Sequence, residues 1–101
     1  MDELRGSQRR YLRSLANRLR PLVQVGRQGV TDTVVKAMND ALDAHELVKV
    51  KFVERKDEKE ALAEAIAEAT GSHQVGMVGH TALFYRQQKD EAKRKIDLAG
   101  R

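Results

Sequence analysis

Hydrophobic positions in the first quarter of the chain change from a helical to an extended pattern. Between Ser7 and Arg20 the apolar residues recur at helical spacing and fall on one face. They are Tyr11, Leu12, Leu15, Ala16 and Leu19. Ser7 can cap this predicted helix, Pro21 prevents its continuation, and Leu22–Val25 then reads as a short strand. The pattern therefore predicts a helix followed by a strand.

The same order repeats in the middle of the chain. Residues 32–44 predict a second amphipathic helix, for which Thr31 is a natural N-cap. Leu47–Val53 alternates as a strand does. One face of this strand is apolar and consists of Val48, Val50 and Phe52. The other face carries Lys49 and Lys51 between Leu47 and Val53. A half-buried strand with a basic outer face is the prediction.

An alanine-rich helix and a hairpin complete the pattern. Asp57–Thr70 predicts a third helix that stops at Gly71. Its expected inward residues are Leu62, Ile66 and Ala69, and its acidic stripe is Glu60, Glu64 and Glu68. Two short strands follow, Gln74–Val78 and Ala82–Arg86, joined by a turn at 79–81. The last residues, 87–101, are polar and predict a flexible tail, in which Ile96 and Leu98 could dock.

The element order α-β-α-β-α-β-β defines an α/β (α+β) domain over residues 1–86. Strands separated by helices of a dozen residues imply parallel crossovers, and the hairpin adds an antiparallel pairing. We therefore expect a mixed four-stranded sheet. The pattern leaves open how the helices divide between the faces of the sheet.

Composition narrows the classes of function. A chain of 101 residues without cysteine excludes disulfides, thiolate metal sites and a thiol nucleophile, and it favours a reducing compartment. No apolar run approaches the roughly 20 residues that span a bilayer, and no secretory segment opens the chain. The three histidines, His45, His73 and His80, are too scattered to predict a metal site. We expect a cytoplasmic protein that is not an enzyme and needs no cofactor.

Charge is distributed unevenly along the chain. Residues 1–30 carry seven Arg against two acids, a net of +5; residues 31–70 carry six basic and ten acidic residues, a net of −4. Residues 71–101 carry six basic against three acidic residues, a net of +3. This polarity favours a surface for a polyanion. A scattered basic surface that only aids solubility is the alternative.

The stretch VGRQGVT places two glycines between the predicted strand and the second helix. A helix N-terminus leaves backbone N–H groups free and attracts phosphate, and glycines allow a close approach of backbone. The KH module clamps RNA with a GxxG loop of this kind. The candidate contact residues here are Gly26, Arg27, Gln28, Gly29 and Thr31. A plain glycine turn before a capped helix is the alternative.

Other basic residues are expected to join this loop in one surface. They are Arg9, Arg10, Arg13, Arg20, Lys49 and Lys51. The acidic third helix should lie away from it. Few aromatic residues are available to stack on bases, since Tyr11 and Phe84 are expected in the core and Tyr85 is the exception. Recognition of phosphate and shape is therefore expected, more than recognition of base sequence.

Three motifs together resemble a known family. The runs LANRLRP, VGRQGVT and HELVKVK, with a later strand ending LFYR, resemble the CRM domain (chloroplast RNA splicing and ribosome maturation) in its single-domain bacterial YhbY form. The resemblance covers about residues 8–86. It implies a fold similar to the C-terminal domain of translation initiation factor three and RNA contact through the GxxG loop, Gly26–Gly29. It also implies a setting in assembly of the large ribosomal subunit.

These observations lead to one hypothesis and two rivals. The hypothesis is a monomeric, non-enzymatic protein that binds structured ribosomal RNA and has no contact with a membrane. The first rival is an adaptor that docks on a ribosomal or other protein through the basic face. The second is a phosphate-binding enzyme or small-nucleotide binder.

Overall fold

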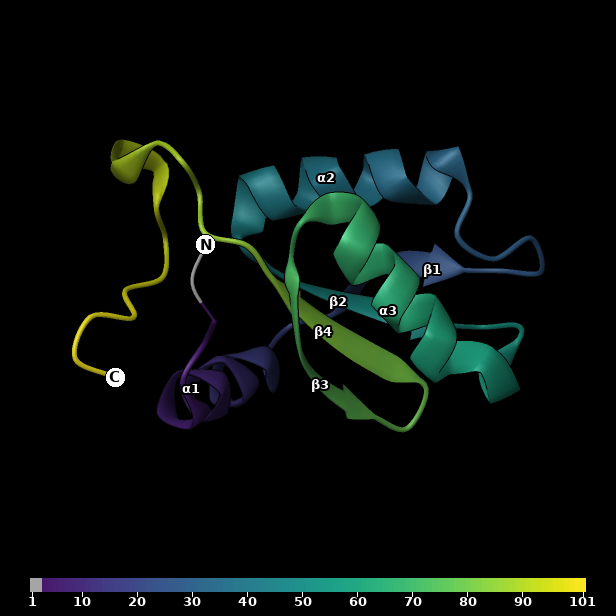
Figure 1. Cartoon of the computed structure of the whole chain (residues 1–101), viewed down its shortest axis with the longest axis horizontal. Helices are drawn as coiled ribbons and strands as arrows, with labels where there is room; N and C mark the ends of the chain where they lie inside the picture. Colours follow the sequence, from purple (N-terminus) through teal and green to yellow (C-terminus); the bar gives the residue numbers. More distant parts are fainter. Residues whose placement is uncertain (1–2) are drawn as a thin grey trace.

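The computed structural model describes residues 3–101 and confirms the predicted order of helices and strands (Figure 1). The helices are α1 (Gly6–Ala16), α2 (Asp32–His45) and α3 (Lys59–Thr70). The strands are β1 (Pro21–Val25), β2 (Leu47–Phe52), β3 (His73–Val78) and β4 (Thr81–Tyr85). Two short 3₁₀ turns, Lys56–Glu58 and Glu91–Lys93, precede α3 and lie in the tail.

The four strands form one mixed sheet in the order β1-β2-β4-β3. β1 and β2 are parallel, as expected for strands joined by a helical crossover, while β4 is antiparallel to both β2 and β3. The second strand of the hairpin thus inserts between β2 and β3. This arrangement brings the loops after β1 and β2 and the β3–β4 turn to the same end of the sheet.

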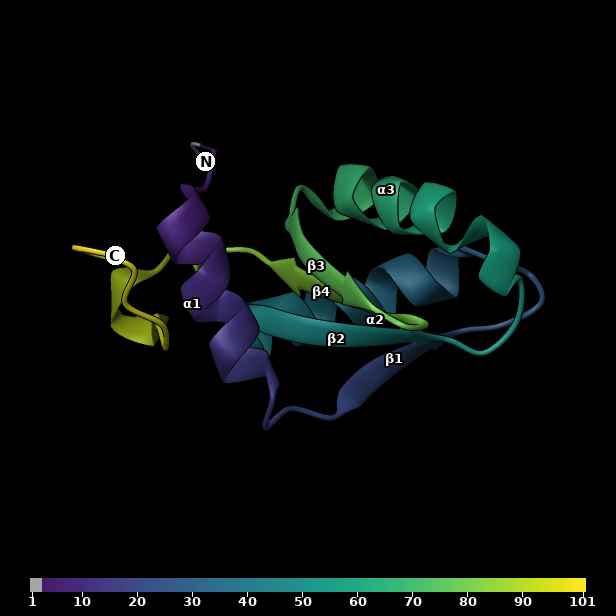
Figure 2. The same cartoon turned by 90° about the horizontal axis from the view of Figure 1, so that it is seen from below.

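The helices divide two to one between the faces of the sheet (Figures 1 and 2). α2 and α3 cover the face that carries Val48, Val50 and Phe52, with Met38, Leu42 and Ile66 packed against them. α1 lies on the other face with a smaller core. That core consists of Leu4, Leu12, Ala16, Leu47, Val75, Leu83 and Tyr85. Figure 2 shows that α1 crosses only one end of this face, so the other half of the sheet has no helix over it.

The first helix is shorter than predicted. It begins at Gly6 rather than at a Ser7 cap, with the N–H of Arg5 donating to Oε1 of Gln8 over 2.8 Å, and it ends at Ala16. Leu19, expected on the buried face, is 37% exposed. The residue before a proline is disfavoured in helical backbone, and the chain needs these residues to turn into β1 at Pro21.

Two further burial predictions are wrong. Ala69 of α3 is exposed, and Ala63 and Thr70 are buried in its place. Tyr85, expected to be the accessible aromatic residue, is fully buried because α1 covers this end of β4. Burial, reinforced by the negative charge of Glu46, raises the pKa of Tyr85 to about 12. Its hydroxyl has no hydrogen-bond partner among residues 3–101.

The tail is held by the buried carboxylate of Glu46, between α2 and β2. Its oxygens accept N–H groups from Gln88 at 2.7 Å, Lys95 at 2.6 Å and Ile96 at 2.9 Å. Ile96 and Leu98 also pack against the smaller core, as the alternative for the tail anticipated. Flexibility of residues 87–101 stays a prediction, and these contacts are the ones that would limit it.

Candidate nucleic-acid interface

The glycine loop forms a tight turn between β1 and α2. The N–H of Gly29 donates to the carbonyl of Gly26 over 3.0 Å, so Arg27 and Gln28 occupy the two central positions. Both side chains are exposed, whereas Gly29 is buried with a left-handed φ of 73°. The turn therefore points an arginine and an amide into solvent, while Gly29 packs on the body of the domain.

The loop leads directly into the start of α2. Thr31 is the N-cap, and its hydroxyl accepts the N–H of Val34 over 3.2 Å, as predicted. The first N–H groups of a helix have no intrahelical partner and carry a partial positive charge. Asp32, exposed in the first turn, complements part of this charge. The start of α2 can thus attract an anion at the glycine loop, but Asp32 offsets part of that attraction. Basic side chains near the loop have to supply the rest.

A second loop, which follows β2, lies beside the glycine loop. The N–H of Val53 donates to the carbonyl of Val25 over 3.0 Å and joins the two loops. Arg55 has a left-handed φ of 52°, and its guanidinium reaches Gly29. The same guanidinium binds both carboxylate oxygens of Glu58, at 2.7 and 2.9 Å. This pair lowers the pKa of Glu58 and raises that of Arg55.

Sequence reasoning missed Arg55 as a neighbour of the glycine loop. It lies 26 positions beyond Gly29, and only the parallel pairing of β1 with β2 brings the two together. A usable signal was present, since both loops follow parallel strands and must emerge at the same edge of the sheet. Arg55 therefore lies beside the glycine loop, with its charge already paired with Glu58.

The two glycines have different structural roles. A Cβ on Gly29 would overlap the guanidinium of Arg55, and the left-handed φ disfavours any side chain there. A Cβ on Gly26 would meet no atom within 4 Å, and Gly26 lies outside the left-handed region. The fold thus explains Gly29 but gives no reason for Gly26, whose bare backbone opens to solvent.

Lys49 and Lys51 lie on β2, the strand next to β1, and alternate with Val48, Val50 and Phe52, so they are on the sheet face opposite α2 and α3. Lys51 is in register with Gln24, one residue from the end of β1 and close to the glycine loop. Lys49 is farther along, where its ammonium donates to the carbonyl of Leu19 over 3.0 Å. Arg20 lines the same cavity as Lys49. Lys51 therefore lies near the glycine loop, whereas Lys49 and Arg20 lie at the start of β1, in a cavity that α1 also lines.

The arginines of α1 lie elsewhere. Arg9 donates to the carbonyl of Gln74 over 2.8 Å and Arg13 to that of Val75 over 3.1 Å, where β3 departs from regular pairing. Arg10 is exposed, and of these three arginines it alone makes no such bond within residues 3–101. Figure 1 places α1 and the glycine loop at opposite ends of the long axis. The predicted single basic surface is thus two separate groups.

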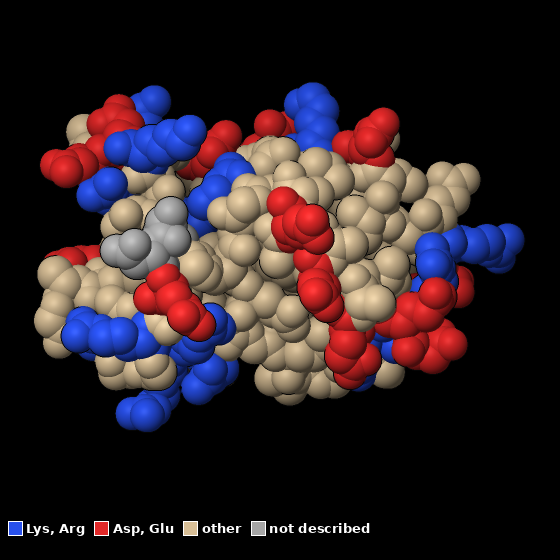
Figure 3. Space-filling view, in the orientation of Figure 1, with Lys and Arg blue, Asp and Glu red and all other residues tan. Residues whose placement is uncertain are grey.

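Acidic residues occupy the opposite side of the sheet from Lys49 and Lys51. Glu60, Glu64 and Glu68 are all exposed, and Figure 3 shows a line of Asp and Glu side chains running over α3. Asp and Glu also border the end of the molecule that carries the glycine loop (Figure 3). A polyanion at that end is therefore limited to the loop and the uncovered face of the sheet.

Neither a metal cluster nor a membrane span is found in the part of the chain that the structure describes. Within residues 3–101 no three His, Asp or Glu side chains gather as metal ligands would. No helix in the same range has the length and apolar character to cross a bilayer.

Fold and loop together define a small α/β domain with a bare-backbone turn at a strand-to-helix junction. The chain belongs to the CRS1/YhbY (CRM) domain family, whose model matches residues 4–86. It is 39% identical over 96 residues to the probable RNA-binding protein YqeI of Bacillus subtilis, covering 94% of this chain and 98% of that one. An RNA-binding protein of Haemophilus influenzae is 36% identical over 94 residues, with 92% and 94% covered.

The fold is shared with a solved structure. The solution structure of SAV1595 from Staphylococcus aureus superimposes with a TM-score of 0.78 at 36% identity, covering 94% of this chain and all of that one. The expected family and fold class are therefore confirmed.

Proposed function

We propose that this protein binds structured RNA, with the backbone of the glycine loop against RNA phosphates. The observation that carries the proposal is Gly26, which the fold does not require and whose open side faces solvent next to Arg27. A ligand that approaches the main chain closely explains a glycine there. Arg27, Lys51, Lys49 and Arg20 would supply the electrostatic attraction, with Gln28 and Thr31 at the loop itself. The names of the relatives support RNA as the polyanion.

The arginines of α1 take a secondary part in this proposal. Arg10 is free to meet a phosphate, whereas Arg9 and Arg13 would have to do so while holding the carbonyls of β3. A shallow surface with few aromatic groups suits contact with phosphate and with the shape of a folded RNA. We therefore propose a non-enzymatic role, in which the monomeric protein occupies ribosomal RNA during assembly of the large subunit.

A pair of glycine variants tests the loop without disturbing the fold. Gly26→Leu should lower the affinity for a fluorescently labelled fragment of precursor large-subunit RNA by about tenfold or more, because the new side chain blocks the approach of a phosphate. Gly6→Leu is the matched control, since a Cβ at Gly6 also meets no atom within 4 Å. Equal affinities for the two variants and the wild type would remove the proposed contact.

Salt dependence tests the electrostatic part. With about four to six phosphate contacts, the log–log slope of affinity against salt should be about −0.7 to −0.9 per contact. Arg27→Glu should weaken binding and make that slope shallower by about one unit. Binding that ignores salt, or an Arg27→Glu variant that binds RNA normally, would favour the protein-adaptor rival.

The ribosomal setting needs a separate measurement. Crosslinking in cells, followed by sequencing of the bound RNA, should recover precursor large-subunit ribosomal RNA. Recovery of messenger or transfer RNA instead would keep RNA binding and overturn the assembly role.

A further inference from the structure

A groove of about 500 Å³ lies where α1, β1, the end of α2 and the tail meet. This volume is within the range of about 300–1,000 Å³ that is usual for ligand sites. Its aliphatic lining consists of Leu15, Leu19, Leu22, Leu47 and Ile96. Leu19 is 37% and Leu22 56% exposed, so the groove presents apolar surface directly to solvent.

The border of the groove is positively charged. Its cations are Arg18, Arg20, Lys49 and Lys95, and in the described chain no Asp or Glu lines the groove. None of the four is in an ion pair within residues 3–101. In the cavity lined by Asn39, Asp43 and Arg86, by contrast, Arg86 is paired with Asp43 at 2.8 Å. The groove therefore combines an apolar floor with cations that lack a counter-charge.

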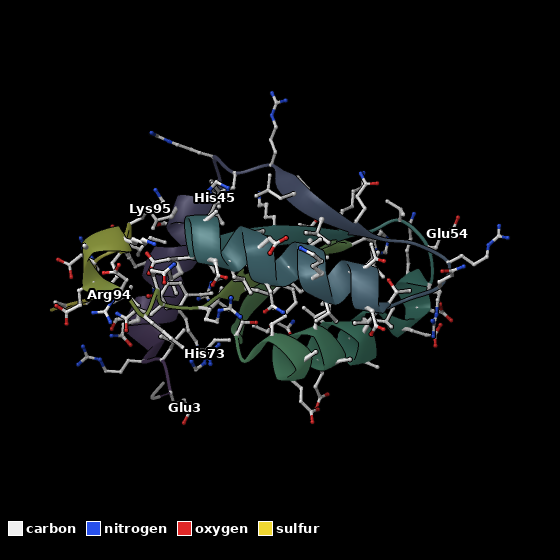
Figure 4. The ribbon with its side chains drawn as sticks, turned by 90° about the horizontal axis from the view of Figure 1, so that it is seen from above. Glu3, His45, Glu54, His73, Arg94 and Lys95 are labelled. Carbon is white, nitrogen blue, oxygen red and sulfur yellow. The ribbon has the colours of Figure 1, made fainter. Side chains whose placement is uncertain are left out.

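The tail completes one wall of the groove. Ile96 and Lys95 enter the lining because their backbone N–H groups are bound to the buried carboxylate of Glu46. Figure 4 shows Lys95 and His45, which also lines the groove, at the same end of α2. The buried carboxylate of Glu46 thus holds Lys95 and Ile96 in place along the groove, although Glu46 does not line the groove itself.

The lining does not suit an unstacked nucleobase. Pockets for single-stranded nucleic acid use aromatic side chains as stacking platforms. The rings in this lining are those of Tyr11 and His45, and the guanidinium of Arg101 already lies 3.8 Å from the centre of the Tyr11 ring. The five aliphatic side chains of the lining suit an aliphatic side chain of a ligand better than they suit a base. The unpaired cations around them complement carboxylates.

We propose that this groove binds an acidic peptide segment of a protein partner, with one aliphatic side chain on the leucine floor and flanking carboxylates at Arg18, Arg20, Lys49 and Lys95. The site is separate from the glycine loop, and its leucine floor, Arg18 and Lys95 take no part in the proposed RNA contact, but it shares Arg20 and Lys49 with the surface proposed for RNA. An acidic segment in the groove would therefore compete with RNA for Arg20 and Lys49 and leave the glycine loop open.

Peptide titrations followed by NMR test the proposal on the full chain. The probe is a nine-residue peptide with Leu-Ile at its centre and Asp and Glu on both sides. It should shift the methyl signals of Leu15, Leu19, Leu22, Leu47 and Ile96, and its affinity should fall as salt rises. A peptide with the same centre but Lys flanks should bind at least about tenfold more weakly.

Variants in the groove, each with a matched variant outside it, distinguish loss of the apolar or charged contacts from a nonspecific effect of the added negative charge. Leu22→Asp should lower the affinity for the acidic peptide by about tenfold, since it removes apolar contact and adds repulsion. Val78→Asp, at a 77% exposed valine outside the groove, should leave the affinity unchanged. Arg18→Glu should also weaken binding, while Lys36→Glu on α2 should not. Neither Arg18 nor Leu22 is assigned to RNA, so RNA affinity is an independent readout.

Each result decides the proposal. Groove shifts that the acidic peptide causes and that Leu22→Asp abolishes would support it. No groove shifts up to millimolar peptide, or equal binding of the acidic and basic peptides, would overturn it. Shifts that a single-stranded RNA oligonucleotide causes and the acidic peptide does not would assign the groove to nucleic acid instead.

Discussion

The two ends of the molecule satisfy their backbone polar groups in different ways. At the glycine-loop end the two loops are joined mainly by bonds between backbone groups, from Gly29 to Gly26 and from Val53 to Val25, with the Thr31 cap as a local side-chain bond. At the α1 and tail end, side chains satisfy the backbone groups instead. Arg9 and Arg13 donate to carbonyls of β3, and the carboxylate of Glu46 accepts N–H groups of the tail. The first end therefore keeps Arg27 free for a ligand, while the second commits many of its charges to the fold.

This difference explains why a count of cations misjudges the surface. The N-terminal thirty residues have a net charge of +5, and the arginines of α1 were predicted to join the glycine loop in one basic surface. Two of its arginines are instead bound to edge-strand carbonyls. A guanidinium that already donates to a buried or edge carbonyl offers fewer donors to a phosphate. Position in the hydrogen-bond network, and not charge alone, separates binding residues from structural ones.

Glu46 gives the largest expected effect. In Glu46→Gln one oxygen can still accept from Lys95 and Ile96, but the amide NH₂ then faces the N–H of Gln88. The lost charge-assisted bonds should lower the free energy of unfolding by about 2–3 kcal/mol in a denaturant titration. Hydrogen exchange should quicken at these three amides and stay unchanged in the glycine loop.

An exposed glutamate provides the control for this variant. Glu64→Gln on α3 should change stability by less than about 0.5 kcal/mol. If Glu46→Gln were equally mild, or left exchange in the tail unaltered, side-chain anchoring of this end would be wrong.

Sequence patterns predicted the parts of the fold that depend on local rules. Alternation in Leu47–Phe52 assigned Val48, Val50 and Phe52 to one face, and capping preferences placed Thr31 and Gly71 at helix ends. The burial of Tyr85 carried no such signal. Residues 82–85 of β4 are all buried, because α1 covers the face that alternation would leave to solvent.

In the candidate site, too, the features that are local in sequence could be predicted and the contacts between distant segments could not. The glycine turn is local in sequence, so its geometry and its exposed Arg27 could be predicted from VGRQG. Arg55 beside Gly29 and Arg13 on Val75 are contacts between segments far apart in the chain. They depend on strand pairing and on an irregularity in β3, neither of which a single sequence encodes locally.

The glycine pair gives the next largest effect. Gly29→Ala should cost about 1–2 kcal/mol of stability, because a left-handed φ strains any residue with a Cβ. Arg55 can swing away from the added methyl group, so backbone strain should dominate. Gly26→Ala should stay within about 0.5 kcal/mol of the wild type. Thermal unfolding of both proteins measures the difference, and equal losses would contradict the separate roles of the two glycines.

A smaller effect separates structural from free arginines on α1. Arg13→Met keeps most of the aliphatic stem but removes the donor to Val75, and should lower stability by about 1 kcal/mol. Arg10→Met, on the exposed side of the same helix, should cost less than about 0.5 kcal/mol. In RNA titrations the order should reverse, with Arg10→Met the weaker binder. Equal stability of the two variants would mean that the carbonyls of β3 do not need the guanidinium.

The smallest expected effect is a pH dependence at the α1 end. Burial at the start of β3 lowers the pKa of His73 from its ordinary value of 6.5, and the positive charge of Arg9 lowers it further. The negative charge of Glu3 raises the pKa of His73 and is the weaker influence. Figure 4 labels Glu3 and His73. Below pH 6.5 the unfolded chain therefore binds a proton that the folded protein resists.

The sign of the effect follows from this difference in proton binding. Stability should be constant above pH 6.5 with respect to His73, fall as the pH drops below that value, and level off beneath the lowered pKa of the folded protein. His73→Gln should remove this decline, which denaturant titrations between pH 7.5 and 5 would measure as a difference from the wild type. An NMR titration of the His73 ring should show a midpoint below 6.5. A midpoint above 6.5 would mean that neither the burial of the ring nor the charge of Arg9 governs the pKa of His73, and the predicted decline in stability at low pH would be wrong.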